Sequence, residues 1–246
     1  MNLYKEIAEI IKNSNYLIAF TGAGISVESG IPPFRGAQGL WSKYDPMEVA
    51  HIESFLKNPT KVWEMLREMF EIVFKAKPNP AHIVLGKLEK LGYLKAVITQ
   101  NIDGLHQLAG NTNVIEYHGN CRWLLCLKCG KKEPVKKELI ENLPYPICKN
   151  CKNPLKPDVI FFGESIPFEI MKKAENEAKS CDVMLIIGTS GIVYPAAGLP
   201  YIAKSNNAII VEINLEETPY TQSITDYFLK DKASETLSKI FHYIRS

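Results

Sequence analysis

The sequence lacks the apolar segments that membrane proteins need. A helix that crosses a bilayer needs about 20 consecutive apolar residues, whereas the longest apolar stretches here, such as residues 183–188, have the length of a strand. The first residues include Glu6 and Glu9 and show no long apolar run with a small-residue cleavage site, so we expect no signal peptide. These absences argue against a membrane protein. The six cysteines, four of them spaced for a metal and only Cys121 and Cys181 left over, fit a reducing compartment, so we expect a cytoplasmic protein.

An excess of charge of one sign is also absent. The 29 Lys and Arg residues nearly balance the 27 Asp and Glu residues, which leaves a net charge of +2. The lysines between residues 131 and 137 form the main local cluster, and Glu133 interrupts it. Proteins that bind nucleic acid or anionic membranes concentrate positive charge. We therefore expect neither as a direct partner.

Internal repeats, low-complexity tracts and long linkers are missing as well, which predicts one catalytic domain over residues 1–246. Helical apolar spacing within residues 3–11 precedes a buried strand at residues 16–20. Further strand-like runs end near residues 99, 118, 188 and 213, with helical patterns at 81–91, 168–179 and 196–204 between most of them. This alternation predicts the α/β class, with a Rossmann-like parallel sheet and helices on both faces.

Two stretches break the alternation and are predicted to form a smaller lobe. Residues 36–79 read as a loop and helical insertion, and residues 121–157 as a cysteine module interrupted by prolines. Cys126 and Cys129 form one C-x-x-C pair, and Cys148 and Cys151 form the second. This spacing favours one tetrahedral Zn²⁺ in a ribbon, with disulfides or unrelated core cysteines as the alternatives. Four thiolates leave zinc no open position, so the ion is expected to be structural.

Polar residues follow each predicted strand, where open parallel sheets bind their ligands. The clusters are residues 21–26, 100–103, 116–119, 189–190 and 214–216. Any one of them could be a turn or a helix cap. Five clusters at one edge of a sheet predict a binding site.

The glycine pattern of a hydride-transferring dehydrogenase is incomplete. Gly22 and Gly24 would let backbone amides approach a pyrophosphate. However, Val27 occupies the third glycine position of G-x-G-x-x-G, and residues 37–41 form no strand ending in an acidic residue. Glu216, after a late strand, is the candidate for a ribose contact. The sequence thus predicts dinucleotide binding without the dehydrogenase fingerprint.

Several motifs together resemble those of one family. They are G-A-G-I-S at 22–26 with G-I-P-P-F-R at 30–35, T-Q-N-I-D at 99–103, H-G at 118–119, the two C-x-x-C pairs, F-F-G-E at 161–164, G-T-S at 188–190, and Asn214. Over residues 16–232 the chain resembles the sirtuin family of NAD-dependent protein deacylases, in its prokaryotic type. The resemblance implies that NAD is a co-substrate and that acetyl-lysine in an extended protein segment is the partner. The implied products are nicotinamide, O-acetyl-ADP-ribose and free lysine.

The resemblance also implies residue roles. His118 would be the base that deprotonates a ribose hydroxyl, with Asn101 and Asp103 orienting ribose and carboxamide; a histidine that only satisfies a core hydrogen bond is the alternative. The implied cofactor-binding residues are Gly22, Ala23, Gly24, Phe34, Arg35, Gln100, Asn101, Ile102, Asp103, Gly188, Thr189, Ser190, Asn214, Leu215, Glu216 and Ala233. The implied substrate-binding residues are Ile160, Phe161, Phe162, Gly163, Val193, Leu66 and Met69, the first four as an apolar edge strand that a peptide joins.

Two positions depart from the family pattern. Pro33 replaces an Asp that family members often carry before Phe-Arg. Leu66 and Met69 align with the positions where succinyl- and malonyl-removing members have Tyr-x-x-Arg. A buried acyl carboxylate would lack its Arg partner there, so we expect neutral acyl groups to be preferred. The alternative is that Leu66 and Met69 are plain core.

Competing functions share parts of this pattern. A mono-ADP-ribosyltransferase or NAD glycohydrolase would cleave the same glycosidic bond without an acyl-lysine acceptor. A zinc-ribbon module that binds nucleic acid or a partner is the alternative from another class. The near-neutral charge and the polar residues at the strand ends count against the binding module.

Overall fold

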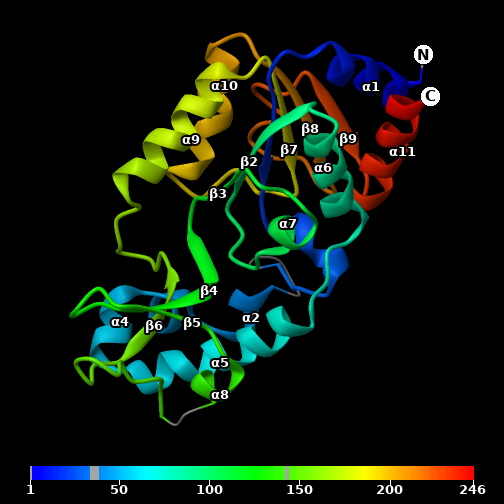
Figure 1. Cartoon of the computed structure of the whole chain (residues 1–246). Coiled ribbons are helices and arrows are strands. Elements are labelled where there is room, and N and C mark those ends of the chain that lie inside the picture. Colours follow the sequence, from blue (N-terminus) through cyan, green and yellow to red (C-terminus); the bar gives the residue numbers. More distant parts are fainter. Residues whose placement is uncertain (1, 34–38, 142–143) are drawn as a thin grey trace.

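The computed structural model describes residues 2–33, 39–141 and 144–246. Figure 1 shows two lobes, with both chain termini close together at the far end of the larger one. Among the helices of the described ranges, none combines the length and the apolar character that a membrane crossing requires.

The larger lobe is built on a six-stranded parallel sheet in the order β3-β2-β1-β7-β8-β9. Its strands are β1 (Leu17–Thr21), β2 (Leu94–Thr99), β3 (Val114–Glu116), β7 (Val183–Ile187), β8 (Ile209–Asn214) and β9 (Tyr227–Lys230). The sequence patterns marked all of them except β9, an edge strand that is only partly buried. The predicted α/β class with a parallel sheet is confirmed.

Side chains alternate across this sheet and create two apolar cores. Leu17 and Ala19 of β1 pack into one core, and Ile18 and Phe20 pack into the other. The first core is covered by α1 (Leu3–Asn13), α6 (Pro80–Lys90) and α11 (Ala233–Arg245), and the second by α9 (Phe168–Ser180) and α10 (Leu199–Ser205). Because both faces are covered, the central strands β1 and β7 are buried at every position rather than at alternate ones.

The smaller lobe joins two separate parts of the chain. Its helices are α2 (Leu40–Lys43), α3 (Pro46–Val49), α4 (Ile52–Lys57), α5 (Pro59–Lys75) and α8 (Lys137–Ile140), and its antiparallel sheet is β5 (Lys132–Pro134), β4 (Gly119–Cys126) and β6 (Leu155–Val159), in that order. Asn58 caps α5 and Pro59 occupies its first turn. The buried Trp63 of α5 donates its indole N–H to the Leu155 carbonyl (2.8 Å), which fastens α5 to β6.

The chain passes from one lobe to the other at the carboxyl edge of the large sheet. β3 ends at Glu116 and β4 begins at Gly119, so His118 lies directly at the junction. The short elements η1 (Ala23–Ser29), α7 (Leu105–Leu108) and η2 (Ala196–Gly198) follow β1, β2 and β7. Several connections therefore converge where the lobes meet.

Candidate functional site

A cleft of about 870 Å³ lies at the carboxyl ends of the parallel strands, where open α/β sheets bind ligands. Residues that follow β1, β2, β7 and β8 line it from the larger lobe. Residues of α5 and of the segment after β6 line it from the smaller lobe. The polar clusters predicted from the sequence thus contribute to one site.

Most of the predicted site residues line this cleft. They are Gly22, Ala23, Gly24, Leu66, Met69, Gln100, Asn101, Ile102, His118, Ile160, Phe161, Phe162, Gly163, Gly188, Thr189, Ser190, Val193, Asn214, Leu215 and Glu216. Asp103 lies behind the lining, and Ala233 packs into the core at the start of α11. Phe34 and Arg35, also predicted from the motif, lie outside the described residues.

The glycine loop after β1 packs directly against the end of β7. The Gly24 amide donates to the Gly188 carbonyl (2.8 Å), and a Cβ on Gly24 would lie 2.6 Å from the Gly188 Cα. The Gly22 amide likewise donates to the Ile187 carbonyl (3.0 Å). Both amides are engaged within the chain, which differs from the expectation that they face a pyrophosphate. Glycine is required here because two backbones meet at close range.

His118 is half-buried and holds its imidazole in a form suited to accept a proton. Its Nδ1 lies 3.2 Å from the Gln100 carbonyl oxygen, and this contact favours the tautomer with a proton on Nδ1 and a free electron pair on Nε2. Burial lowers the pKa of His118 below its ordinary value, although the hydrogen bond to Gln100 opposes that shift. The imidazole is therefore neutral near pH 7, as a general base must be.

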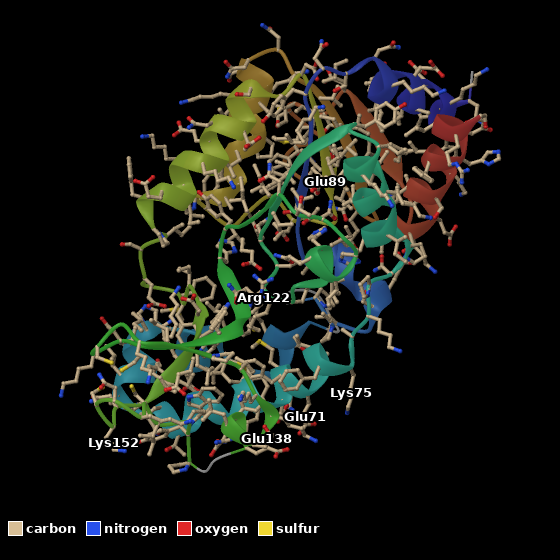
Figure 2. The ribbon with its side chains drawn as sticks, viewed as in Figure 1. Glu71, Lys75, Glu89, Arg122, Glu138 and Lys152 are labelled. Carbon is tan, nitrogen blue, oxygen red and sulfur yellow. The ribbon has the colours of Figure 1, made fainter. Side chains whose placement is uncertain are left out.

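One carboxylate holds the turn that carries His118. Glu116 accepts hydrogen bonds from Gln107 (2.9 Å), Asn120 (3.0 Å) and the Arg122 guanidinium (2.7 Å). Figure 2 shows Arg122 on the ribbon between the two lobes. Burial raises the pKa of Glu116, and the Arg122 charge opposes the shift. From the sequence, Glu116 is predicted only as a member of a polar cluster, without this role.

A second network fixes Asn101 and Asp103. The Ser26 hydroxyl donates to Asp103 (2.7 Å) and accepts from the Asn101 amide nitrogen (3.1 Å), which also donates to the Gly22 carbonyl (3.0 Å). Burial raises the pKa of Asp103, although its hydrogen bonds favour the carboxylate. Ser26 was not predicted as a site residue from the sequence, although its position inside the glycine motif was an available signal.

The apolar end of the cleft lies against α5. Leu66 and Met69 line the cleft and also pack in the core of the smaller lobe. The two alternatives for these residues, a place in the acyl channel and a place in the core, are therefore compatible. The charged side chains among the described lining residues are the carboxylates of Glu164, Glu216 and Glu217. In the part of the chain that the structure describes, no Lys or Arg lines the cleft.

Residues 160–163 do not form the predicted edge strand. β6 ends at Val159, and only Phe162 continues as an isolated bridge, to His51. The amides of Ile160, Phe161 and Phe162 all donate to acceptors within the chain. Gly163 has no hydrogen-bond partner for its amide or carbonyl among the described residues. A peptide that binds to this segment by backbone hydrogen bonds would therefore use the amide and the carbonyl of Gly163.

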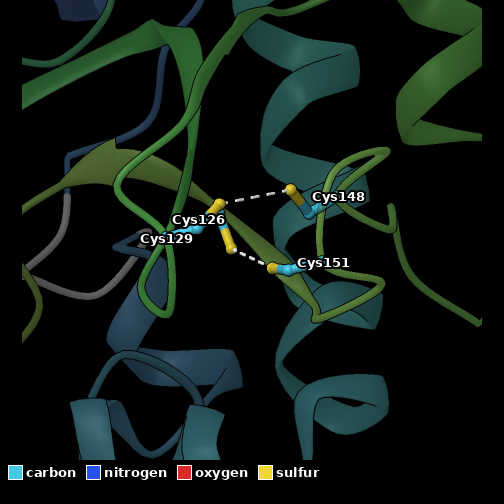
Figure 3. Close-up of side chains that lie close together, drawn as sticks. All are labelled: Cys126, Cys129, Cys148 and Cys151. Carbon is cyan, nitrogen blue, oxygen red and sulfur yellow. Dashed lines mark hydrogen bonds between the residues drawn. The ribbon is translucent and has the colours of Figure 1, made fainter.

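The four module cysteines form one cluster, shown in Figure 3. The thiols of Cys126 and Cys151 lie 3.4 Å apart, those of Cys129 and Cys148 lie 3.7 Å apart, and all four lie within 4.8 Å of one another. Tetrahedral zinc with bonds of about 2.3 Å places its sulfurs about 3.8 Å apart, whereas a disulfide needs about 2.05 Å. The spacing fits zinc, and the disulfide alternative is wrong because all six cysteines are free thiols.

Comparisons with known proteins agree with these features. The sequence model of the Sir2 family matches residues 22–195. An NAD-dependent protein deacylase of Pyrococcus abyssi (strain GE5 / Orsay) is 47% identical over 246 residues, covering 98% of this chain and 97% of the relative.

Solved structures show the same fold. A Sir2 homolog in complex with NAD has a TM-score of 0.92 at 44% identity, covering 98% of this chain and 93% of that one. A Sir2 variant with a deacetylated p53 peptide and 3′-O-acetyl ADP ribose has a TM-score of 0.91 at 37% identity, covering 97% of each chain. Fold, motifs and cysteine cluster agree along nearly the whole length, and the chain therefore belongs to the Sir2 family, the sirtuins.

Proposed function

We propose that this protein is an NAD-dependent protein deacylase that removes acetyl and other neutral acyl groups from lysine side chains. The observation that carries the proposal is the neutral His118, which lines the same cleft as Asn101 and the apolar residues of α5. The deacylase of Pyrococcus abyssi and the Sir2 complex with deacetylated peptide and acetyl ADP ribose support the same reaction class.

The cleft has the polar groups that a dinucleotide needs. When bound, NAD supplies an ADP-ribosyl group that accepts the acyl group as nicotinamide is released. Gln100 donates to the Thr189 hydroxyl (2.8 Å) and Asn214 donates to the Thr189 carbonyl (2.9 Å), so three strand ends form one rigid wall. Along this wall Ser190 and Glu216 would hold hydroxyl groups of the cofactor. Phe34 and Arg35 stay predictions from the sequence.

His118 would accept a proton from a ribose hydroxyl at Nε2 while Nδ1–H stays bonded to Gln100. Asn101 and Asp103 would orient the ribose and the carboxamide, and Ser26 keeps both side chains in place. Since Asp103 lies behind the cleft lining, its effect would pass through Ser26 and Asn101.

The partner would be an extended protein segment that carries the acyl-lysine. Gly163 from the smaller lobe and Val193 from the loop after β7 both line the cleft. Backbone hydrogen bonds to such loops bind a segment with little dependence on its side chains. Leu66 and Met69 would surround the acyl group. A cytoplasmic location also stays a prediction, supported by four cysteines that are placed for a metal and by the unpaired Cys121 and Cys181.

The test is mass spectrometry of the products formed from NAD and an acetyl-lysine peptide. We expect nicotinamide, O-acetyl-ADP-ribose and the deacetylated peptide in equal amounts. Nicotinamide without loss of the acetyl group would instead indicate a glycohydrolase, and a mass increase on protein would indicate an ADP-ribosyltransferase. Omission of NAD is the control, because a simple amidase would still release the acetyl group.

A further inference from the structure

A lysine is buried directly behind the proposed peptide edge. Lys156 of β6 is 1% exposed, which is rare for this residue type. Its ammonium donates to the carbonyls of Val159 (2.6 Å) and Pro157 (3.2 Å) and pairs with the Glu164 carboxylate (3.0 Å). All three N–H donors of the ammonium are thus used within the chain.

Glu164, the ion-pair partner of Lys156, lies at the end of the loop that follows β6 and is bonded to that loop. The Glu164 carboxylate accepts the Phe161 amide (2.8 Å), and the Glu164 amide donates to the Phe161 carbonyl (3.0 Å). The Lys156 ammonium also lies 4.6 Å from the centre of the Phe161 ring. The ion pair therefore holds residues 157–163 from inside.

The opposite side of this loop lines the cleft. Because neighbouring amides are already bonded, Gly163 alone of residues 160–163 has both backbone groups without a partner among the described residues. Gly163 has a φ of +82° and packs against His51 so closely that a Cβ would lie 2.7 Å from the imidazole Nε2. The directions in which the Gly163 amide and carbonyl point thus depend on the conformation of this loop.

The cysteine module sets the position of Lys156. In the β4–β6 pairing, Lys156 lies opposite Leu125, and the next pair along is Leu155 with Cys126. β6 also begins shortly after Cys151. Both strands that fix the register of Lys156 are therefore continuous with cysteine loops of the proposed zinc site.

We infer that Lys156 is a positioning residue for the peptide substrate. Its ion pair with Glu164 holds residues 157–163 in the conformation that presents the Gly163 backbone to an extended acyl-lysine segment. This inference rests on the proposed deacylase function. Lys156 does not line the cleft, so it acts on the peptide through the loop and has no direct effect on NAD.

Steady-state kinetics of the full chain test the inference, with the acetylated peptide and NAD varied separately. Lys156→Met and Glu164→Gln should each raise KM for the peptide about tenfold, equivalent to about 1.4 kcal/mol, while KM for NAD changes less than about twofold. The double variant should lose less than the product of the two single effects, because it leaves no buried charge unpaired. Lys156→Arg, which keeps the charge, should recover most of the affinity.

Lys132→Met is the matched control. It removes another lysine ion pair of the same small sheet, with Asp158 (2.6 Å), but this lysine is exposed. We expect no change in either KM.

Binding of a fluorescent acetylated peptide, measured by anisotropy, keeps this test independent of turnover. If the wild-type chain binds the peptide and deacetylates nothing, the proposed function fails while the inference is still decided by the affinities. Unchanged peptide affinity in folded, zinc-loaded Lys156→Met would overturn the inference, as would an equal rise in both KM values. Should Lys156→Met not fold, Glu164→Gln decides, since glutamine still offers an acceptor to the Phe161 amide.

Discussion

Burial changes the acid-base chemistry of individual site residues in opposite directions. It lowers the pKa of His118 and raises the pKa of Asp103, because in each case the charged form loses hydration. The first shift keeps a base available near pH 7. The second makes a carboxyl group dependent on its bonds to Ser26 and to the start of α7.

Replacing His118 with Ala should reduce deacetylation by about 10²–10⁴, the usual cost of losing a general base. NAD affinity and the melting temperature should change little, because among the described residues the side chain has a single hydrogen-bond partner, Gln100. Turnover and NAD titration measure the two effects. His242→Ala, at an exposed histidine of α11, is the control. A His118→Ala enzyme that kept more than half the rate would exclude the assigned role.

The apolar end of the cleft predicts acyl preference. Succinyl-lysine should be processed at least about tenfold less efficiently than acetyl-lysine, because its carboxylate would lose a charge-assisted hydrogen bond of roughly 1.5–3 kcal/mol. Comparing kcat/KM on one peptide with either acyl group measures this. Met69→Arg should narrow the difference, whereas Glu64→Gln, an equal charge change at an exposed position of α5, should not. Equal turnover by the wild-type chain would mean that another cation serves the channel.

At the scale of elements, the antiparallel sheet of the smaller lobe depends on its cysteines. One C-x-x-C loop follows β4 and the other precedes β6. His118 lies directly before β4, and Gly163 lies four residues after the end of β6. These strands share an apolar core with α5, which includes Trp63, Leu124 and Leu155. A zinc ion bound by the four cysteines would add to the stability of this core by joining the two cysteine loops.

Zinc removal or Cys126→Ala should lower the melting temperature, and activity should fall only as the smaller lobe loses order. Zinc content measured beside thermal melting checks this, and Cys181→Ala, at a buried cysteine outside the cluster, should keep its full zinc. A metal-bound water in the spectrum of a cobalt-substituted sample would contradict the structural role, because four thiolates leave no open position.

At the scale of the whole molecule, two buried histidines join α6 and α7 beneath the site. The rings of His82 and His106 lie 5.0 Å apart, and the His106 Nε2 lies 2.9 Å from the Thr21 hydroxyl. The His82 Nε2 and the His106 Nδ1 have no partner among the described residues. Burial lowers the pKa of His82 to about 4 and that of His106 to about 3.

These two shifts predict acid instability. Between pH 6.5, the ordinary value, and the folded values the unfolded chain binds more protons than the native one. Stability should therefore fall as pH falls through this window, by up to about 1.4 kcal/mol per pH unit for each histidine. Urea unfolding at stepped pH measures the slope. His106→Asn should flatten it and His242→Asn, at the exposed position, should not; an unchanged slope in His106→Asn would contradict the assignment.

The sequence by itself determined the features that depend on local spacing. Two C-x-x-C pairs specify a tetrahedral site because neighbouring residues supply each pair of ligands. Continuous apolar runs separated by helical patterns specify a parallel sheet, because its strands are buried on both faces. The motifs around Gly22, Asn101 and His118 are contiguous segments, so they could be recognised without knowing where the chain folds back.

Tertiary structure decided whatever depends on residues brought together from distant segments. The amides of Gly22 and Gly24 bond to the end of β7 instead of facing the cleft, and Ser26 joins Asn101 to Asp103 across two loops. The contact of His118 with the Gln100 carbonyl joins the ends of two different strands, and no local pattern encodes it. Nothing in the local sequence distinguishes Lys156 from an exposed lysine of a strand. Its burial follows from the packing of β4, β6 and the loop to Glu164 around it. Burial and pairing are properties of the assembled chain, because desolvation depends on every segment that surrounds a group.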